Sequence, residues 1–110
     1  MKFRPLRPIS VAREIALPDP PETMRAVVFD ETGDPDVLHT ATLPVPAPVI
    51  SELLVRVVAA GVNPIDAKTR AGRGVSGAIT ALPSTLGFDF SGIVMNAPYE
   101  AHPFPPGTEV

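Results

Sequence analysis

The sequence contains no cysteine among its 110 residues, so it can form neither a disulfide framework nor a thiolate metal site. No segment approaches the roughly 18 consecutive apolar residues of a membrane helix, and we expect no membrane association. Nine Lys and Arg against twelve Asp and Glu give a net charge of −3, without a cationic run, so no nucleic-acid partner is expected. A thiol-free chain fits a reducing compartment, and we expect a cytoplasmic protein.

Three familiar arrangements of catalytic or binding residues are also missing. No Gly-x-Gly-x-x-Gly motif opens a helix after a strand, so dinucleotide binding by this chain alone is not expected. His39 and His102 have no spaced partner and are interpreted as solvated side chains, so no metal is expected. A triad of Ser91, His102 and Asp89 is not favoured by the spacing.

Proline, by contrast, is abundant, with 15 residues, most of them in three clusters at 5–21, 44–48 and 98–106. Because proline cannot donate to a sheet ladder, these clusters are expected to separate ordered elements. Residues 1–23 are interpreted as a proline-rich tail, and residues 24–110 as one domain.

Short runs of β-branched and apolar residues predict strands, each bounded by turn-forming residues. They cover 24–30, 37–43, 52–60 and 91–95, and another begins at 107. In the run at 52–60 only Arg56 is charged after Glu52, so both faces of that strand are expected to be covered. The fold class predicted is mainly β: a small, partly open barrel of antiparallel strands with one or two short helices. Because the last strand is unfinished at Val110, we expect the chain to be a fragment.

One short helix is predicted after the strand that ends near Gly61. Asn63 suits the N-cap, Pro64 the first helical position, and Asp66 can reach back from the third. Gly72 ends the helix. Asn63 and Asp66 either only cap this helix or also face a ligand.

A second unusual segment places two aromatic residues and a carboxylate between glycines at 87–92. One interpretation is a tight turn, in which Phe88 and Phe90 anchor the core while Asp89 caps the backbone or pairs with a cation. The other is that this segment contributes to a functional site.

Together these segments resemble the GroES-like catalytic domain of the medium-chain dehydrogenase/reductase superfamily, over residues 24–110. The matching pieces, in order, are Met24-Arg-Ala-Val-Val, Gly33-Asp-Pro-Asp-Val-Leu, Pro44-Val-Pro-Ala-Pro, Leu54-Val-Arg-Val, Ala59-Ala-Gly-Val-Asn-Pro-Ile-Asp, Gly87-Phe-Asp-Phe-Ser-Gly-Ile-Val and Pro106-Gly-Thr-Glu-Val. Each piece is weak alone, but their shared order is specific. The resemblance implies that the chain stops before the dinucleotide-binding domain of that family.

The residue types at a few positions indicate which branch of this superfamily the chain resembles. Zinc-containing members carry a cysteine ligand where this chain has Asn63, and a His-Glu pair where it has Phe88 and Asp89. The chain therefore resembles the zinc-free quinone oxidoreductase (zeta-crystallin-like) branch and its enone-reductase relatives. That resemblance implies hydride transfer from NADPH or NADH to a quinone or an α,β-unsaturated carbonyl, and a homodimer of the full protein.

The same resemblance implies roles for individual residues. Asn63 would line the nicotinamide–substrate cleft, with Asp66 and Lys68 beside it as further catalytic residues. Pro64, Phe88 and Asp89 would line the substrate side. Lys68 stands where many quinone reductases have tyrosine, which leaves their tyrosine-assisted proton delivery without a counterpart. Two other functions stay open: a stand-alone GroES-like interaction module, and an enoyl-reductase-type domain within a larger synthase.

Overall fold

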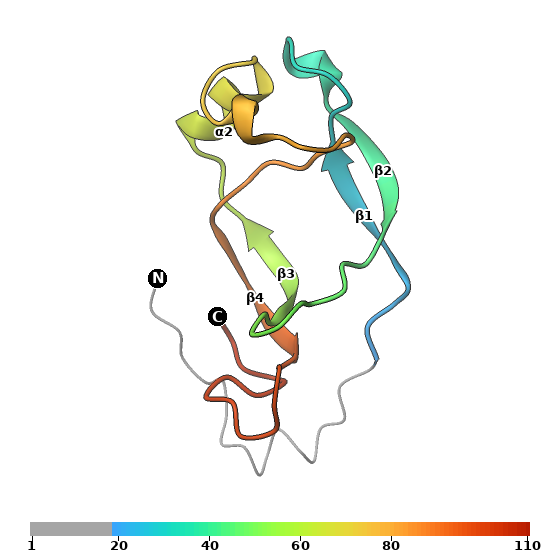
Figure 1. The fold of residues 1–110 in the computed structure, drawn as a ribbon, viewed down its shortest axis with the longest axis vertical. Coiled ribbons are helices and arrows are strands. Elements are labelled where there is room, and N and C mark those ends of the chain that lie inside the picture. Colours follow the sequence, from blue (N-terminus) through green and yellow to red (C-terminus); the bar gives the residue numbers. More distant parts are fainter. Residues whose placement is uncertain (1–18) are drawn as a thin grey trace. The chain divides into compact units, whose positions relative to one another are not determined.

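The computed structural model describes residues 19–110 (Figure 1). The tail predicted over 1–23 therefore lies mostly outside the described residues. The described chain divides into two compact units. One contains Val45–Ala60 and Phe90–Val110, and the other contains Thr23–Pro44 and Gly61–Asp89.

In the second of these units, strands β1 (Thr23–Val28) and β2 (His39–Pro44) form an antiparallel pair (Figure 1). A short 3₁₀ helix, η1 (Pro35–Val37), lies in the connection between them. Burial alternates along β1, as expected for a strand with one covered face. The strand ends in the small core of this unit, where Val28 and Phe29 are fully buried.

In the other unit, β3 (Leu54–Ala60) pairs antiparallel with β4 (Phe90–Asn96). The predicted strand at the end of the chain pairs with the opposite edge of β4. Gly92 and Val110 exchange two backbone hydrogen bonds of 2.9 Å each, and the N–H of Val94 donates to Thr108 at 2.9 Å. β4 is therefore bonded along both edges, and its Val94 is fully buried.

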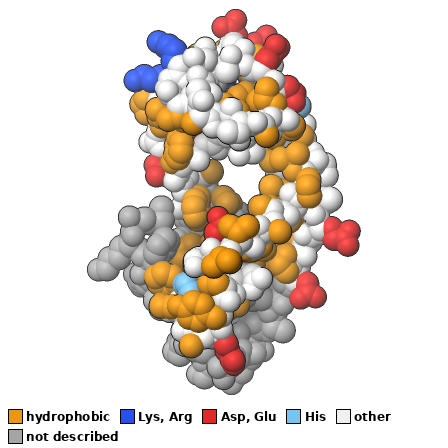
Figure 2. Space-filling model, in the orientation of Figure 1, with side chains coloured by type: hydrophobic (Ala, Val, Ile, Leu, Met, Phe, Trp, Pro, Cys, Tyr) orange, Lys and Arg blue, Asp and Glu red, His pale blue; other side chains and the backbone are white. Residues whose placement is uncertain are grey.

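The expectation that both faces of the strand at 52–60 are covered is wrong. Val57 and Val58 in β3 are 55% and 65% exposed. A continuous apolar run predicts a strand sandwiched between layers, but a small sheet of two full strands has too few side chains to cover both faces. Figure 2 shows apolar side chains open to solvent on the face in view.

The predicted helix is present as α2 (Pro64–Arg70), followed by η2 (Ser76–Ala78). Gly72 follows the C-cap with a φ of +95°, the left-handed conformation that favours glycine at a helix end. The buried Thr69 hydroxyl donates to the Ile65 carbonyl at 2.7 Å and accepts from the Val75 N–H at 3.2 Å. This hydroxyl links the helix to the loop that follows it.

The predicted fold class is confirmed: the chain is mainly β, its strand pairs are antiparallel, and its helices are short. Among residues 19–110, no helix combines the length and apolar composition needed to cross a membrane.

Candidate functional site

The start of α2 is built by backbone and carboxylate contacts between Asn63 and Asp66. Asn63 is extended, with φ −124° and ψ 160°, and Pro64 occupies the first helical position. The Asn63 N–H donates to Oδ2 of Asp66 at 2.9 Å, and the Asp66 N–H donates to the Asn63 carbonyl at 2.9 Å. The predicted reach of Asp66 back to the N-cap is thereby confirmed.

Asp66 is also one of the most buried polar residues of the described chain, at 4% exposure. Its Oδ1 atom is buried without a hydrogen-bond partner. A buried acceptor left unpaired costs about 1–3 kcal/mol, so this oxygen offsets part of the stabilisation that Oδ2 provides. Asp66 holds the Asn63 backbone in place, while its second oxygen faces inward rather than toward solvent.

Asp89 contacts Asn63 from 26 residues away in the sequence. The Nδ2 of Asn63 donates to Oδ2 of Asp89 at 2.6 Å. The expectation that Asp89 caps a backbone group or pairs with a cation is wrong, because its carboxylate accepts from this neutral amide. An exposed turn placed beside Asn63 offers the carboxylate an amide donor, a long-range contact that sequence spacing does not reveal.

Gly61 holds Asp89 in this position, a role that the sequence pattern did not predict. Its N–H donates to the Asp89 carbonyl at 2.8 Å. A Cβ on Gly61 would lie 3.2 Å from the Cβ of Asp89, tighter than ordinary van der Waals contact. The signal in the sequence is a glycine directly after a strand, which can mark a close approach of two backbones.

The other predicted site residues are exposed to solvent. Pro64 and Lys68 are exposed on α2. Phe88 is 62% and Phe90 37% exposed, so the interpretation of both as core anchors is wrong. Gly87 precedes them with a φ of +111°, and the turn it forms carries Phe88 into solvent. The structure thus brings together Asn63, Asp66 and Asp89.

The histidines make local contacts instead of forming a metal site. Within the described residues, no group of three or more His, Cys, Asp or Glu is placed to hold a metal ion. His39 hydrogen-bonds Asp30 at 2.6 Å. His102 is half-buried rather than solvated, because its Nδ1 accepts from the Phe104 N–H at 2.9 Å and its ring lies 5.1 Å from that of Tyr99.

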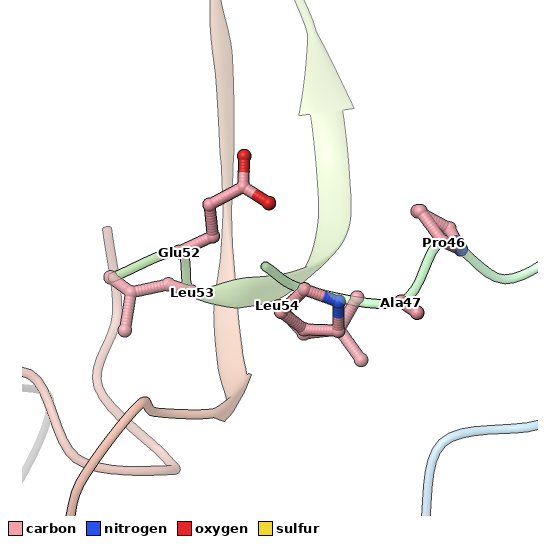
Figure 3. Close-up of a pocket in the computed structure, with 6 residues that line it drawn as sticks. Pro46, Ala47, Glu52, Leu53 and Leu54 are labelled. Carbon is pink, nitrogen blue, oxygen red and sulfur yellow. The ribbon is translucent and has the colours of Figure 1, made fainter. Parts of the chain in front are cut away.

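A pocket of about 340 Å³ is lined by none of the predicted site residues. Its lining residues are Pro46, Ala47, Pro48, Glu52, Leu53 and Leu54. Figure 3 shows Pro46 and Ala47 beside the start of β3. One Glu52 oxygen accepts from the Val49 N–H at 2.8 Å, so the main polar group of the pocket already serves a turn.

Comparison with known proteins places these features in a family. The model of the alcohol dehydrogenase GroES-like domain matches residues 50–110. A chloroplastic NADPH-dependent alkenal/one oxidoreductase of Arabidopsis thaliana is 34% identical, over 82% of this chain and 23% of its own length. The mitochondrial NAD(P)H oxidoreductase RTN4IP1 of Homo sapiens is 37% identical, over 89% of this chain and 28% of its own length.

A solved structure agrees with the sequence comparisons. The quinone oxidoreductase from Coxiella burnetii superimposes with a TM-score of 0.73 at 38% identity, covering 79% of this chain and 28% of that protein. The chain spans about a quarter of the length of the relatives it matches. By its family match and its antiparallel fold, the chain belongs to the alcohol dehydrogenase GroES-like domain family.

Proposed function

We propose that this chain is the substrate-side domain of a zinc-free, NAD(P)H-dependent reductase of quinones or α,β-unsaturated carbonyls. The observation that carries the proposal is the anchored amide of Asn63, which donates one N–H to Asp89 and has a second to offer a carbonyl oxygen. Similar proteins are named for the reduction of alkenals or quinones, which supports this substrate class.

The residues present do not suit a catalytic zinc. Zinc sites of enzymes use thiolate, imidazole or carboxylate ligands, three of them from the protein. At the positions matched by resemblance the chain offers the amide of Asn63, the hydrocarbon ring of Phe88 and Asp89, whose carboxylate is bonded to that amide. The proposed chemistry therefore involves no metal.

The residues do suit a neutral carbonyl near a nicotinamide. When bound, the cofactor would supply the hydride. The free N–H of Asn63 would bind the carbonyl oxygen and stabilise the negative charge that develops on it. Asp66 would hold the Asn63 backbone, and the exposed Lys68 ammonium would add positive charge beside the same carbonyl. Pro64, Phe88 and Asp89 would line the substrate side.

The remaining assignments follow from the same proposal. Residues 24–110 would form the domain, with residues 1–23 as a tail. Sequence outside this chain would supply the dinucleotide-binding part, since the relatives are about four times longer than the matched segment. A homodimer and a cytoplasmic location are proposed with it. Because relatives carry chloroplastic and mitochondrial names, fluorescence microscopy against organelle markers is the test of location.

The experiment is NADPH and NADH oxidation with a panel of quinones and enones. The 110-residue chain is compared with the protein expressed from its complete reading frame, with and without a zinc chelator. We expect turnover from the longer protein alone, unchanged by the chelator. Loss of turnover with the chelator contradicts the zinc-free assignment, and no turnover from either protein contradicts the reductase proposal.

A further inference from the structure

We propose that Asp89 is a positioning residue that fixes which end of the Asn63 amide faces the substrate. The inference rests on the proposed function, because the substrate is the carbonyl compound assigned above. The two ends of an asparagine amide have nearly the same shape but opposite hydrogen-bonding character. Whatever holds the amide in one orientation therefore decides whether the site offers a donor or an acceptor.

The carboxylate of Asp89 supplies that selection. An ionised carboxylate only accepts hydrogen bonds, so it bonds the NH₂ end of Asn63 and rejects the oxygen end. The observed distance from Nδ2 of Asn63 to Oδ2 of Asp89 is 2.6 Å, and hydrogen bonds to an ionised acceptor are shorter and stronger than neutral ones. One hydrogen of the NH₂ group is used here, and the other remains for a carbonyl oxygen.

Both partners of this bond are held by their backbones. Asn63 donates its N–H to the Asp66 carboxylate and accepts the Asp66 N–H at its carbonyl, each at 2.9 Å. Pro64, the next residue, restricts its own backbone and that of Asn63. Asp89 is tied to Gly61 by the 2.8 Å bond to its carbonyl. With both backbones held, the bond to Asp89 restricts rotation of the Asn63 amide, together with the capping-box contact between the Asn63 side chain and the Asp66 backbone.

NMR spectroscopy measures the orientation of the Asn63 amide without any need for enzyme activity. Asn63 and Asn96 are the two asparagines of the sequence, so asparagine-selective ¹⁵N labelling gives two side-chain NH₂ signals, with Asn96 as the internal control. We expect one Asn63 amide proton far downfield in the wild-type protein, and we expect D89N to move this proton upfield. An Asn63 signal that is identical in wild type and D89N, or that lies at the random-coil position, overturns the proposal.

Kinetics of the protein from the complete reading frame test whether the reaction needs the donor end of the Asn63 amide. In D89N the new amide bonds either end of Asn63, and we expect kcat/KM for the carbonyl to fall several-fold. The exchanged double variant N63D/D89N restores a carboxylate–amide bond with its polarity reversed, so position 63 has no donor. Loss of an oxyanion donor lowers rates by about 10²–10³, and we expect at least a 100-fold loss here.

A double variant with activity near the wild-type value shows that position 63 needs no donor, and this result overturns the proposal. Equal thermal denaturation midpoints of the two variants and wild type confirm that loss of activity is not unfolding. Absence of turnover in the wild-type protein contradicts the proposed function instead, and the NMR measurement then decides the orientation of Asn63 independently.

Discussion

Replacement of Gly92 by alanine is expected to be among the most destabilising single-methyl changes in this chain. Gly92 lies in β4 opposite Val57, next to an irregularity in the β3–β4 register between Val57 and Ala59. An added Cβ would overlap the Arg56 carbonyl oxygen and would lie 2.7 Å from a methyl group of Val55. The nearest obstacle is backbone, so rotation of a side chain cannot relieve the overlap.

The expected loss of stability follows from the displacement of β4 that the added methyl group requires. Overpacking costs about 1–3 kcal/mol. Displacement of β4 also strains the two 2.9 Å hydrogen bonds between Gly92 and Val110, and a hydrogen bond is worth about 0.5–1.5 kcal/mol. We expect Gly92→Ala to lower the free energy of unfolding by about 2–4 kcal/mol. In a domain of this size that loss corresponds to a fall in Tm on the order of 10–20 °C.

Gly77→Ala is the matched control, since its added Cβ meets nothing within 4 Å. We expect it to change stability by less than about 1 kcal/mol, in the stabilising direction, because it restricts only the unfolded chain. Urea and thermal denaturation followed by far-UV circular dichroism measure both variants. If Gly92→Ala is as stable as Gly77→Ala, the reasoning from backbone overlap is refuted.

Three further substitutions test other contacts by the same denaturation assay. Asp66→Ala removes the acceptor of the Asn63 N–H and should cost about 1 kcal/mol, as for loss of a helix cap; an unchanged urea midpoint contradicts that role. Thr69→Val removes the hydroxyl that accepts from the Val75 N–H and should cost about 0.5–1.5 kcal/mol, whereas Thr69→Ser keeps the hydroxyl and should cost much less. His39→Ala breaks only an exposed contact with Asp30 and should cost less than about 1 kcal/mol; a larger loss shows that this pair does more than a surface contact.

The start of α2 shows where sequence reasoning succeeds. The residues that begin this helix, Asn63, Pro64 and Asp66, lie within four consecutive positions. Their capping contacts depend on local backbone geometry and side-chain length. The strand assignments succeed for a similar reason, because β-branched runs bounded by proline and glycine are a local signal. The family resemblance extended this local information by relying on the order of several short segments.

The candidate site shows where such reasoning stops. The spacing of Asn63 and Asp89 in the sequence left their roles open, because no local pattern predicts a bond between residues 26 positions apart. The close approach at Gly61 and the overlap at Gly92 likewise depend on which backbone passes beside each glycine.

For β3, likewise, the sequence predicted the strand but not its burial. The apolar run at 54–60 identifies a strand, yet the exposure of Val57 and Val58 depends on how many other segments pack against it. Short-range chemistry thus accounts for the helix cap, the strands and the turns of this chain. The amide–carboxylate pair of Asn63 and Asp89 and the exposure of β3 depend on chain folding, because they arise between segments whose separation in sequence carries no information about their distance in space.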